Sequence, residues 1–294
     1  MSNNAIRKVG GALLAGTVAL SLAACGSASD GEDDTKELSI GLIRAWSDTE
    51  VAAALLEHKA LELGYEVTWE DLNDPPLLYA GVAQGDVDVY ASAWIDRTHK
   101  EYYERYDDGL EILGKYHEGE GNMLAVPSYS AMQSIEDIHD HWDEIGQQIV
   151  GIEPGAGLTQ QMVEEVLPAY GFEEADMITS STPAMLIELQ SAMDAGEEIV
   201  VTLWSPFWAT TQMDVRPLDD PLNAFGDSEG IYYVGTAGFA EERPDLAEWL
   251  EDFELTEDEF GSLENLIVNE YEDGEEDLAI AEWLEDYPHV FDES

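Results

Sequence analysis

The sequence predicts an α/β fold built from two similar lobes. Three observations predict it: strand and helix patterns alternate from residue 37 onward, the alternation runs through two separate cycles, and extended segments flank the second cycle. Alternating strands and helices favour a mainly parallel sheet covered by helices, because a parallel crossover needs a connection of a dozen or more residues. Each cycle is therefore expected to form one lobe.

The first cycle consists of five expected elements. They are a strand at 38–43, a helix at 47–63, a strand at 65–72, a helix at 75–85 and a strand at 87–94. Ser47 or Asp48 can cap the first helix, and Gly64 ends it. Pro75 opens the second helix and Gly85 stops it, since proline suits a first helical turn and glycine the position after the last.

The second cycle repeats this order. The expected elements are a strand at 148–152, a helix at 159–167, a strand at 177–180, a helix at 183–195 and a strand at 199–204. Pro168 is expected to end the first of these helices, because proline lacks the N–H that a helix interior uses.

Two extended segments, 123–127 and 231–239, lie on either side of the second cycle and are expected to cross between the lobes. The expected boundaries are 37–127 plus 232–294 for lobe 1 and 128–231 for lobe 2. The acidic tail from 244 to 289 is expected to be helical and to be held on the first lobe by seven apolar residues. These are Trp249, Leu250, Phe253, Leu263, Ile267, Ile280 and Trp283.

The first 24 residues have the pattern of a signal peptide rather than of a domain. Two basic residues precede an apolar run at 9–24 that is short for a spanning helix, which needs ~20 residues. The run ends in Leu-Ala-Ala directly before Cys25, which resembles the lipobox of a bacterial lipoprotein. Cys25 is the only cysteine, which excludes an internal disulfide. We expect residues 25–36 to form a flexible tether.

The composition excludes several classes of function. Sixty-five acidic residues face 11 basic ones, and the formal charge of −54 argues against a nucleic-acid-binding protein. Hydrophobic residues make up 45% of the chain, which is more than an acidic disordered chain contains. Such acidity is typical of proteins exposed to molar salt, where repulsion is screened over roughly 3 Å.

Enzyme signatures are scarce. The sequence contains no GxSxG, HExxH, GxxxxGKS/T or GxGxxG motif. His139-Asp140-His141 is interpreted as a solvated helix end rather than a metal site, and no calcium loop follows Asp86 and Asp88. No catalytic residue, cofactor or metal is expected.

Three tryptophans follow strands of the two cycles. Trp46 comes just after the first strand, Trp94 closes the third, and Trp204 closes the last strand of the second cycle. Open α/β sheets bind ligands at the carboxyl ends of their strands, so the three are expected to share a site, although a single tryptophan is more often a core residue. A glycine-rich turn, Glu153-Pro-Gly-Ala-Gly157-Leu158-Thr159, runs into a helix whose free N–H groups favour a carboxylate.

These segments resemble three motifs of glycine betaine-binding proteins from quaternary-amine ABC importers. The motifs are Trp94-Ile-Asp-Arg-Thr-His99, Gly151-Ile-Glu-Pro-Gly-Ala-Gly157-Leu158 and Leu203-Trp204-Ser-Pro-Phe-Trp208. The resemblance covers nearly the whole mature chain and implies a two-lobed, periplasmic-binding-protein-like fold of type II with a ligand cleft between the lobes. Phe207 stands where the family often has His, and Asp96 where Pro is common.

The resemblance also implies the ligand contacts. A cage around the trimethylammonium would consist of Trp46, Trp94 and Trp204, and the carboxylate ligands would be the His99 side chain and the backbone N–H groups of Gly157 and Leu158. A quaternary ammonium has no N–H to donate, so aromatic faces are the groups that discriminate it.

The implied function is that of a substrate-binding lipoprotein, not an enzyme. It would be anchored through Cys25 at the outer face of the cytoplasmic membrane, capture glycine betaine or a related osmolyte as a monomer, and deliver it to an ABC permease and its ATPase. Closure is expected at hinges near 123–130 and 228–238. The alternatives are a receptor for choline, carnitine, proline betaine or ectoine, or a secreted carboxylate-dependent enzyme with calcium as a candidate ion.

Overall fold

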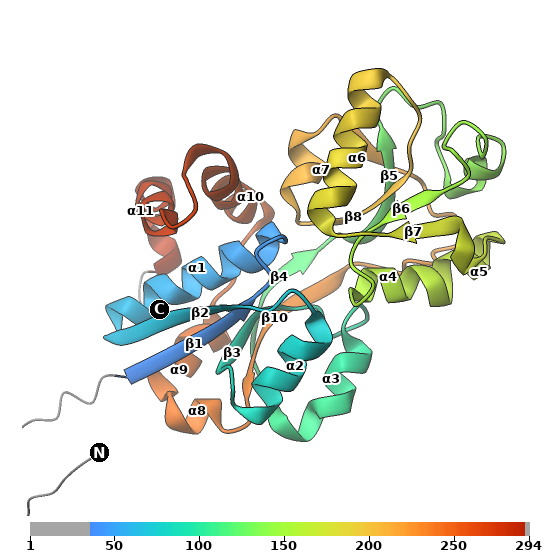
Figure 1. The fold of residues 1–294 in the computed structure, drawn as a ribbon. Coiled ribbons are helices and arrows are strands. Elements are labelled where there is room, and N and C mark those ends of the chain that lie inside the picture. The colour runs from blue at the N-terminus through green and yellow to red at the C-terminus, as the bar shows by residue number, and fades with distance from the viewer. Residues whose placement is uncertain (1–35, 292–294) are drawn as a thin grey trace, which may run out of the picture. The chain divides into compact units, whose positions relative to one another are not determined.

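A computed structural model describes residues 36–291, whose strands form two sheets (Figure 1). The expected signal peptide, Cys25 and nearly all of the tether at 25–36 lie outside the described residues. No helix within 36–291 is long and apolar enough to cross a membrane.

The first sheet has the strand order β2-β1-β3-β10-β4. Its strands are β1 (Lys36–Leu42), β2 (Tyr65–Asp71), β3 (Val89–Ala93), β4 (Leu110–Gly119) and β10 (Glu229–Thr236). β1 pairs in parallel with β2 and β3, whereas β10 is antiparallel to β3 and β4. The connection from β1 to β2 runs in one direction across the sheet and that from β2 to β3 in the other, so their helices cover opposite faces. These helices are α1 (Ser47–Glu62) and α2 (Pro75–Gln84), and α3 (Lys100–Tyr106) packs against α2.

The second sheet repeats this plan with the order β7-β6-β8-β5-β9. Its strands are β5 (Gly121–Pro127), β6 (Ile149–Gly151), β7 (Met177–Thr179), β8 (Val201–Ser205) and β9 (Val215–Pro217). Here β6 is parallel to β7 and β8, and β5 is the antiparallel strand. The helices are α4 (Gly157–Gln161), α5 (Leu167–Tyr170), α6 (Thr182–Ala195) and α7 (Trp208–Gln212). We call the two sheets with their helices the first and second lobes, and the expected α/β fold with two mainly parallel sheets is confirmed.

The strand pairing differs from the expected lobe boundaries in two places. β5 was expected to end the first lobe at residue 127, but it pairs with β8 and β9 of the second sheet. The chain therefore leaves the first sheet between Gly119 and Gly121. It returns before Glu229, a few residues earlier than the expected boundary at 231 and 232. An extended apolar segment does not reveal which of two sheets it joins, because both offer it an apolar surface.

The prediction that Pro168 ends a helix was wrong. The helix that begins at Gly157 continues through a π-helical stretch, Met162–Val166, and through Pro168 to Tyr170. A π turn shifts the backbone hydrogen bonds from i→i+4 to i→i+5, and such a shift can accommodate a residue without an N–H. Gly171, with φ of 80°, ends the helix in the left-handed conformation.

The acidic tail packs on the first lobe, as expected. It forms α8 (Phe239–Glu242), α9 (Pro244–Asp252), α10 (Glu257–Asn265), a π-helical turn (Leu266–Glu270) and α11 (Glu276–Asp286). α9 lies against β4, and α10 and α11 lie beside α1 (Figure 1). Six of the seven expected anchors are buried and Trp249 is partly buried. The six buried anchors are Leu250, Phe253, Leu263, Ile267, Ile280 and Trp283.

Candidate functional site

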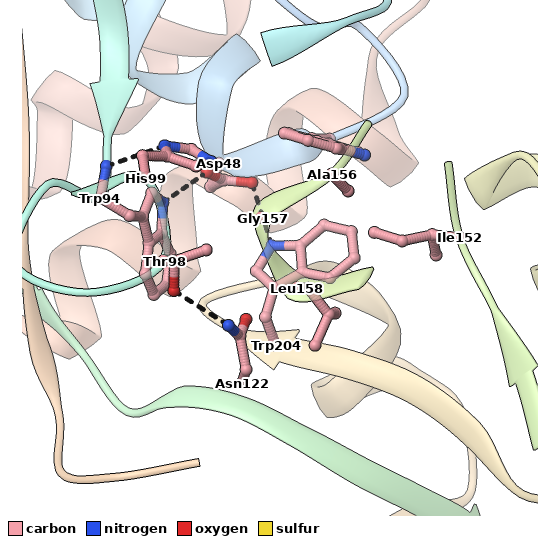
Figure 2. Close-up of a pocket in the computed structure, with 11 residues that line it drawn as sticks. Asp48, Trp94, Thr98, His99, Asn122, Ile152, Ala156, Gly157, Leu158 and Trp204 are labelled. Carbon is pink, nitrogen blue, oxygen red and sulfur yellow. Dashed lines mark hydrogen bonds between the residues drawn. The ribbon is translucent and has the colours of Figure 1, made fainter. Parts of the chain in front are cut away.

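A pocket lies where the carboxyl ends of β1, β3, β6 and β8 come together (Figure 2). The space between its lining residues, counted together with the part that is open to solvent, is about 310 Å³. All six ligand residues expected from the sequence line it: Trp46, Trp94, His99, Gly157, Leu158 and Trp204. Asp48, Thr98, Asn122, Ile152 and Ala156 complete the lining. None of the eleven is a lysine or an arginine, so the described part of the chain places no permanent positive charge at the wall.

Two of the tryptophans share one buried carboxylate. Trp204 Nε1 donates to Asp48 Oδ1 at 3.1 Å, and Trp94 Nε1 lies 3.4 Å from Asp48 Oδ2 (Figure 2). Ser92 Oγ donates to the same Oδ2 at 2.7 Å. Asp48 is 1% exposed, and burial raises its pKa above the ordinary value in spite of these hydrogen bonds. A cation held in the pocket would stabilise the ionised form of this carboxylate.

The third tryptophan is held from the opposite lobe. Trp46, at the turn between β1 and α1, donates from Nε1 to Thr182 Oγ1 at the start of α6, at 3.0 Å. The Trp46 and Trp204 rings meet edge to face with centroids 5.8 Å apart. Because all three indole N–H groups already have partners in the protein, the rings can offer their faces to a ligand rather than their hydrogen-bond donors.

Phe207 and Asp96, the two positions that differ from the family pattern, do not line the pocket but contact elements that do. Phe207 is fully buried and stacks on Trp204, with ring centroids 4.0 Å apart and an interplanar angle of 21°. Asp96 accepts hydrogen bonds from Gly230 N at 2.9 Å and from Tyr232 Oη. It therefore ties the loop between Trp94 and His99 to β10.

His99 is a neutral imidazole whose tautomer is fixed by the backbone. Burial lowers its pKa to about 3. Its Nδ1 accepts the N–H of Trp94 at 3.1 Å, so the single ring proton lies on Nε2. No protein acceptor for Nε2 is found within 36–291. The loop thus presents an uncharged N–H donor at the pocket wall.

The glycine-rich turn adds backbone donors. Gly157 and Leu158 open α4, where the first N–H groups have no partner within the helix. Gly157 also fits tightly under the first lobe, since a Cβ there would lie 2.2 Å from the carbonyl oxygen of Thr98. This position therefore requires a glycine.

Asp48 and Asn122 are pocket residues that the sequence reasoning missed. Asp48 was interpreted as a possible helix cap, but Trp46 occupies that position and the Asp48 side chain enters the pocket. Asn122 Nδ2 donates to Thr98 Oγ1 at 2.9 Å and to Gln161 Oε1 at 2.8 Å, which links the two lobes. The sequence feature that could have indicated a role for Asn122 is its position, as a polar residue, at the start of an otherwise apolar strand.

A second buried carboxylate lies behind the site. Glu264 of α10 accepts a hydrogen bond from Ser47 Oγ at 2.5 Å. Ser47 lies between Trp46 and Asp48 in the chain. It is 3% exposed, and burial raises its pKa to about 7. The acidic tail therefore reaches the segment that carries Trp46.

Comparisons with known proteins point to one family. The glycine betaine/carnitine transport binding protein GbuC of Listeria monocytogenes is 35% identical over 142 residues, which are 47% of this chain and 46% of that protein. The match thus spans about half the length of that relative. The crystal structure of lactococcal OpuAC, closed and complexed with glycine betaine, superposes with a TM-score of 0.76 at 28% identity, covering 86% of this chain and 96% of that one.

A second structure agrees with the first. The glycine betaine/L-proline-binding protein ProX from Borrelia burgdorferi gives a TM-score of 0.77 at 28% identity and covers 87% of this chain and 95% of that chain. Residues 36–286 match the OpuAC family, described as the substrate-binding domain of ABC-type glycine betaine transport systems. That match includes both lobes and every residue of the pocket. The chain therefore belongs to the OpuAC family of substrate-binding domains.

Proposed function

We propose that this protein captures glycine betaine, or a closely related quaternary ammonium zwitterion, outside the cytoplasm and delivers it to the permease of an ABC importer. Family membership supports the class of function. The lactococcal structure contains glycine betaine, and the names of two further relatives specify it. The observation that carries the proposal is one pocket lined by three indoles and a buried carboxylate as well as by neutral N–H donors.

The ammonium end would be the cage of Trp46, Trp94 and Trp204. Each aromatic face contributes ~0.5 to 2 kcal/mol to a desolvated cation, so three faces supply several kcal/mol of the ~8 kcal/mol that a micromolar site needs. Asp48, whose carboxyl group accepts hydrogen bonds from two of the indoles, adds a negative charge at this end when it is ionised, and a bound cation favours that form. Ammonium groups that carry N–H would lose water that the indole faces cannot replace.

The carboxylate end would be His99 Nε2 with the N–H groups of Gly157 and Leu158. All three donors are uncharged, so a carboxylate bound there is not paired with a cationic side chain. A ligand that is positive at one end and negative at the other fits this division, because Asp48, the one acidic side chain among the pocket residues within 36–291, then faces the positive end. Choline would fill the cage and leave the three donors without an acceptor.

We infer that Cys25 carries a lipid anchor at the outer face of the cytoplasmic membrane, that the tether at 25–36 spaces the lobes from it, and that the acidic surface suits high salt. The protein is proposed to act as a monomer that closes by bending near Glu120 and before Glu229, where the chain passes between the sheets.

Calorimetric titration at high salt tests the ligand. Glycine betaine, choline, carnitine, proline betaine and ectoine are compared with dimethylglycine, sarcosine and glycine. We expect betaine to bind with micromolar affinity or better, and binding to weaken with each methyl group removed. Glycine bound as tightly as betaine, or no binding of any quaternary amine, would refute the proposal.

A further inference from the structure

A hydrogen-bond chain runs from Trp46 of the cage to Glu153 of the glycine-rich turn. Trp46 Nε1 donates to Thr182 Oγ1 at 3.0 Å, and Thr182 Oγ1 donates to Glu153 Oε2 at 2.8 Å. The backbone N–H of Thr182 donates to the other carboxylate oxygen, Glu153 Oε1, also at 2.8 Å. Thr182 has no exposed surface. Neither Thr182 nor Glu153 lines the pocket.

The chemistry of the hydroxyl fixes the direction of this chain. A threonine hydroxyl has a single hydrogen, and the Glu153 carboxylate can only accept, so the hydrogen is given to Glu153. The Thr182 oxygen is then left with lone pairs, which is what the indole N–H of Trp46 requires. Glu153 thus orients Thr182, and Thr182 orients Trp46.

The chain also joins the two ends of the site and the two lobes. Trp46 belongs to the first lobe, whereas Thr182 and Glu153 belong to the second. The carbonyl oxygen of Glu153 accepts the N–H of Ala156 at 3.0 Å and so closes the turn that presents Gly157. The bond from Trp204 to Asp48 runs in the opposite direction, from the second lobe to the first.

We propose that Thr182 and Glu153 are positioning residues that hold the Trp46 indole against the second lobe and couple the ammonium end of the site to the carboxylate end. The inference rests on the proposed function for its ligand. Without the acceptor on Thr182, the Trp46 N–H would be buried between the lobes with no partner whenever the lobes are together. A buried donor without a partner destabilises that state specifically.

A double-mutant cycle tests the coupling. Thr182→Val keeps the side-chain shape and removes the acceptor, and it should weaken betaine binding about tenfold, which corresponds to about 1.4 kcal/mol. Trp46→Phe keeps an aromatic face and removes the donor. In the Trp46→Phe background, Thr182→Val should change the affinity less than twofold. A loss of the same size in both backgrounds would mean that Thr182 only supports its lobe, and would overturn the proposal.

Two further variants make the cycle specific. Thr202→Val removes another fully buried hydroxyl, on β8, whose Oγ1 has no hydrogen-bond partner within 36–291, and it should leave the affinity unchanged. Glu153→Gln removes the charge that takes the Thr182 hydrogen, and it should weaken binding severalfold but add little to Thr182→Val. Additive losses for Glu153→Gln and Thr182→Val would contradict the chain.

Hydrogen exchange of the Trp46 indole N–H separates the chain from the ligand assignment. We expect Thr182→Val to accelerate this exchange at least fivefold in at least one of two samples, the ligand-free or the betaine-saturated protein. Thr202→Val should accelerate the exchange in neither sample. If wild-type protein fails to bind betaine but Thr182→Val still accelerates the exchange of the Trp46 indole N–H, the proposed ligand is refuted and the chain is supported. Betaine binding with no change in exchange in either form would support the function and overturn the chain.

Discussion

The neutral state of His99 predicts that betaine affinity does not follow the titration of an ordinary histidine. With a pKa of about 3, the imidazole is roughly 1% protonated at pH 5, whereas a histidine of pKa 6.5 would be about 97% protonated there. Its Nε2–H can therefore serve as the same donor from pH 5 to 8. We expect the affinity for betaine not to rise as the pH falls from 8 to 5 at constant high salt. Protonation of Asp48, whose pKa burial raises, would weaken binding at the acidic end instead.

Removing the imidazole should affect only the carboxylate end. A hydrogen bond to a charged group contributes about 1.5 to 3 kcal/mol, so His99→Ala should weaken betaine binding roughly 10- to 150-fold and leave choline binding nearly unchanged. His141→Ala is the control, because His141 is on the second lobe and the one side-chain partner of its imidazole within 36–291 is Glu144. Isothermal titration calorimetry measures both ligands. Affinity that rises as the pH falls through 6.5, or equal losses for betaine and choline, would refute the assigned role of His99.

Four further predictions concern the cage, stability and anchoring. Substituting Trp46, Trp94 or Trp204 by Ala should weaken betaine binding tenfold or more with little loss of stability in the ligand-free protein. Substituting the same residue by Phe should give an affinity between those of wild type and the Ala variant in calorimetry. Glu264→Gln should stabilise the fold at pH 8 and have little effect at pH 5. Burial raises the pKa of Glu264 from 4.5 to about 7, so between these pH values the folded state keeps a proton that the unfolded state has lost. The free energy of unfolding therefore falls by up to about 3 kcal/mol as the pH rises through this window, and denaturant unfolding measures it. The melting temperature should rise steeply from 0.05 to 2 M salt. The formal charge is −54, and the acidic side chains repel one another when screening is weak. Cys25→Ser should release the protein from the membrane fraction or leave it unprocessed.

Each of these predictions has an outcome that contradicts it. A loss of ~3 to 5 kcal/mol of folding free energy in the tryptophan variants, with normal betaine binding, would make those residues core rather than cage. Equal effects of Glu264→Gln at pH 5 and pH 8 would mean that Glu264 does not titrate in between. A flat melting temperature would count against the role of surface repulsion. Wild-type processing and fractionation of Cys25→Ser would remove the lipoprotein hypothesis.

Local patterns were sufficient for the fold and for half of the pocket. Glycines that end helices and the alternation of apolar residues in strands predicted the order of elements. The three tryptophans follow the ends of those strands, and all three line the pocket. The two errors have different physical causes. The sheet that β5 joins depends on β8 and β9, which lie far away in the chain, whereas Pro168 is tolerated because the π-helical turn directly before it widens the helix.

Asp48 illustrates what sequence patterns leave out. An aspartate at the start of a helix is usually a cap, but here Thr49 closes the turn through Ile43, and its Oγ1 both accepts the Ile43 N–H and donates to the Ile43 carbonyl. Asp48 is therefore available to Trp204, which lies 156 positions away in the chain. The same holds for Thr182, whose partner Trp46 is 136 positions away. No local spacing rule connects such pairs.

The distribution of charge explains how a site can work inside so acidic a protein. Surface charges are screened over roughly 3 Å in molar salt, and an exposed lysine or arginine at the carboxylate end would be screened and hydrated like any other surface charge. Enclosed indole faces, backbone amides and a neutral imidazole depend on contact and on exclusion of water rather than on long-range attraction. A zwitterion has no net charge, so the field of the acidic surface neither draws it in nor repels it. Under the proposed function, the chain would separate two requirements: the surface carboxylates would suit high salt, while recognition would depend on groups that salt does not screen.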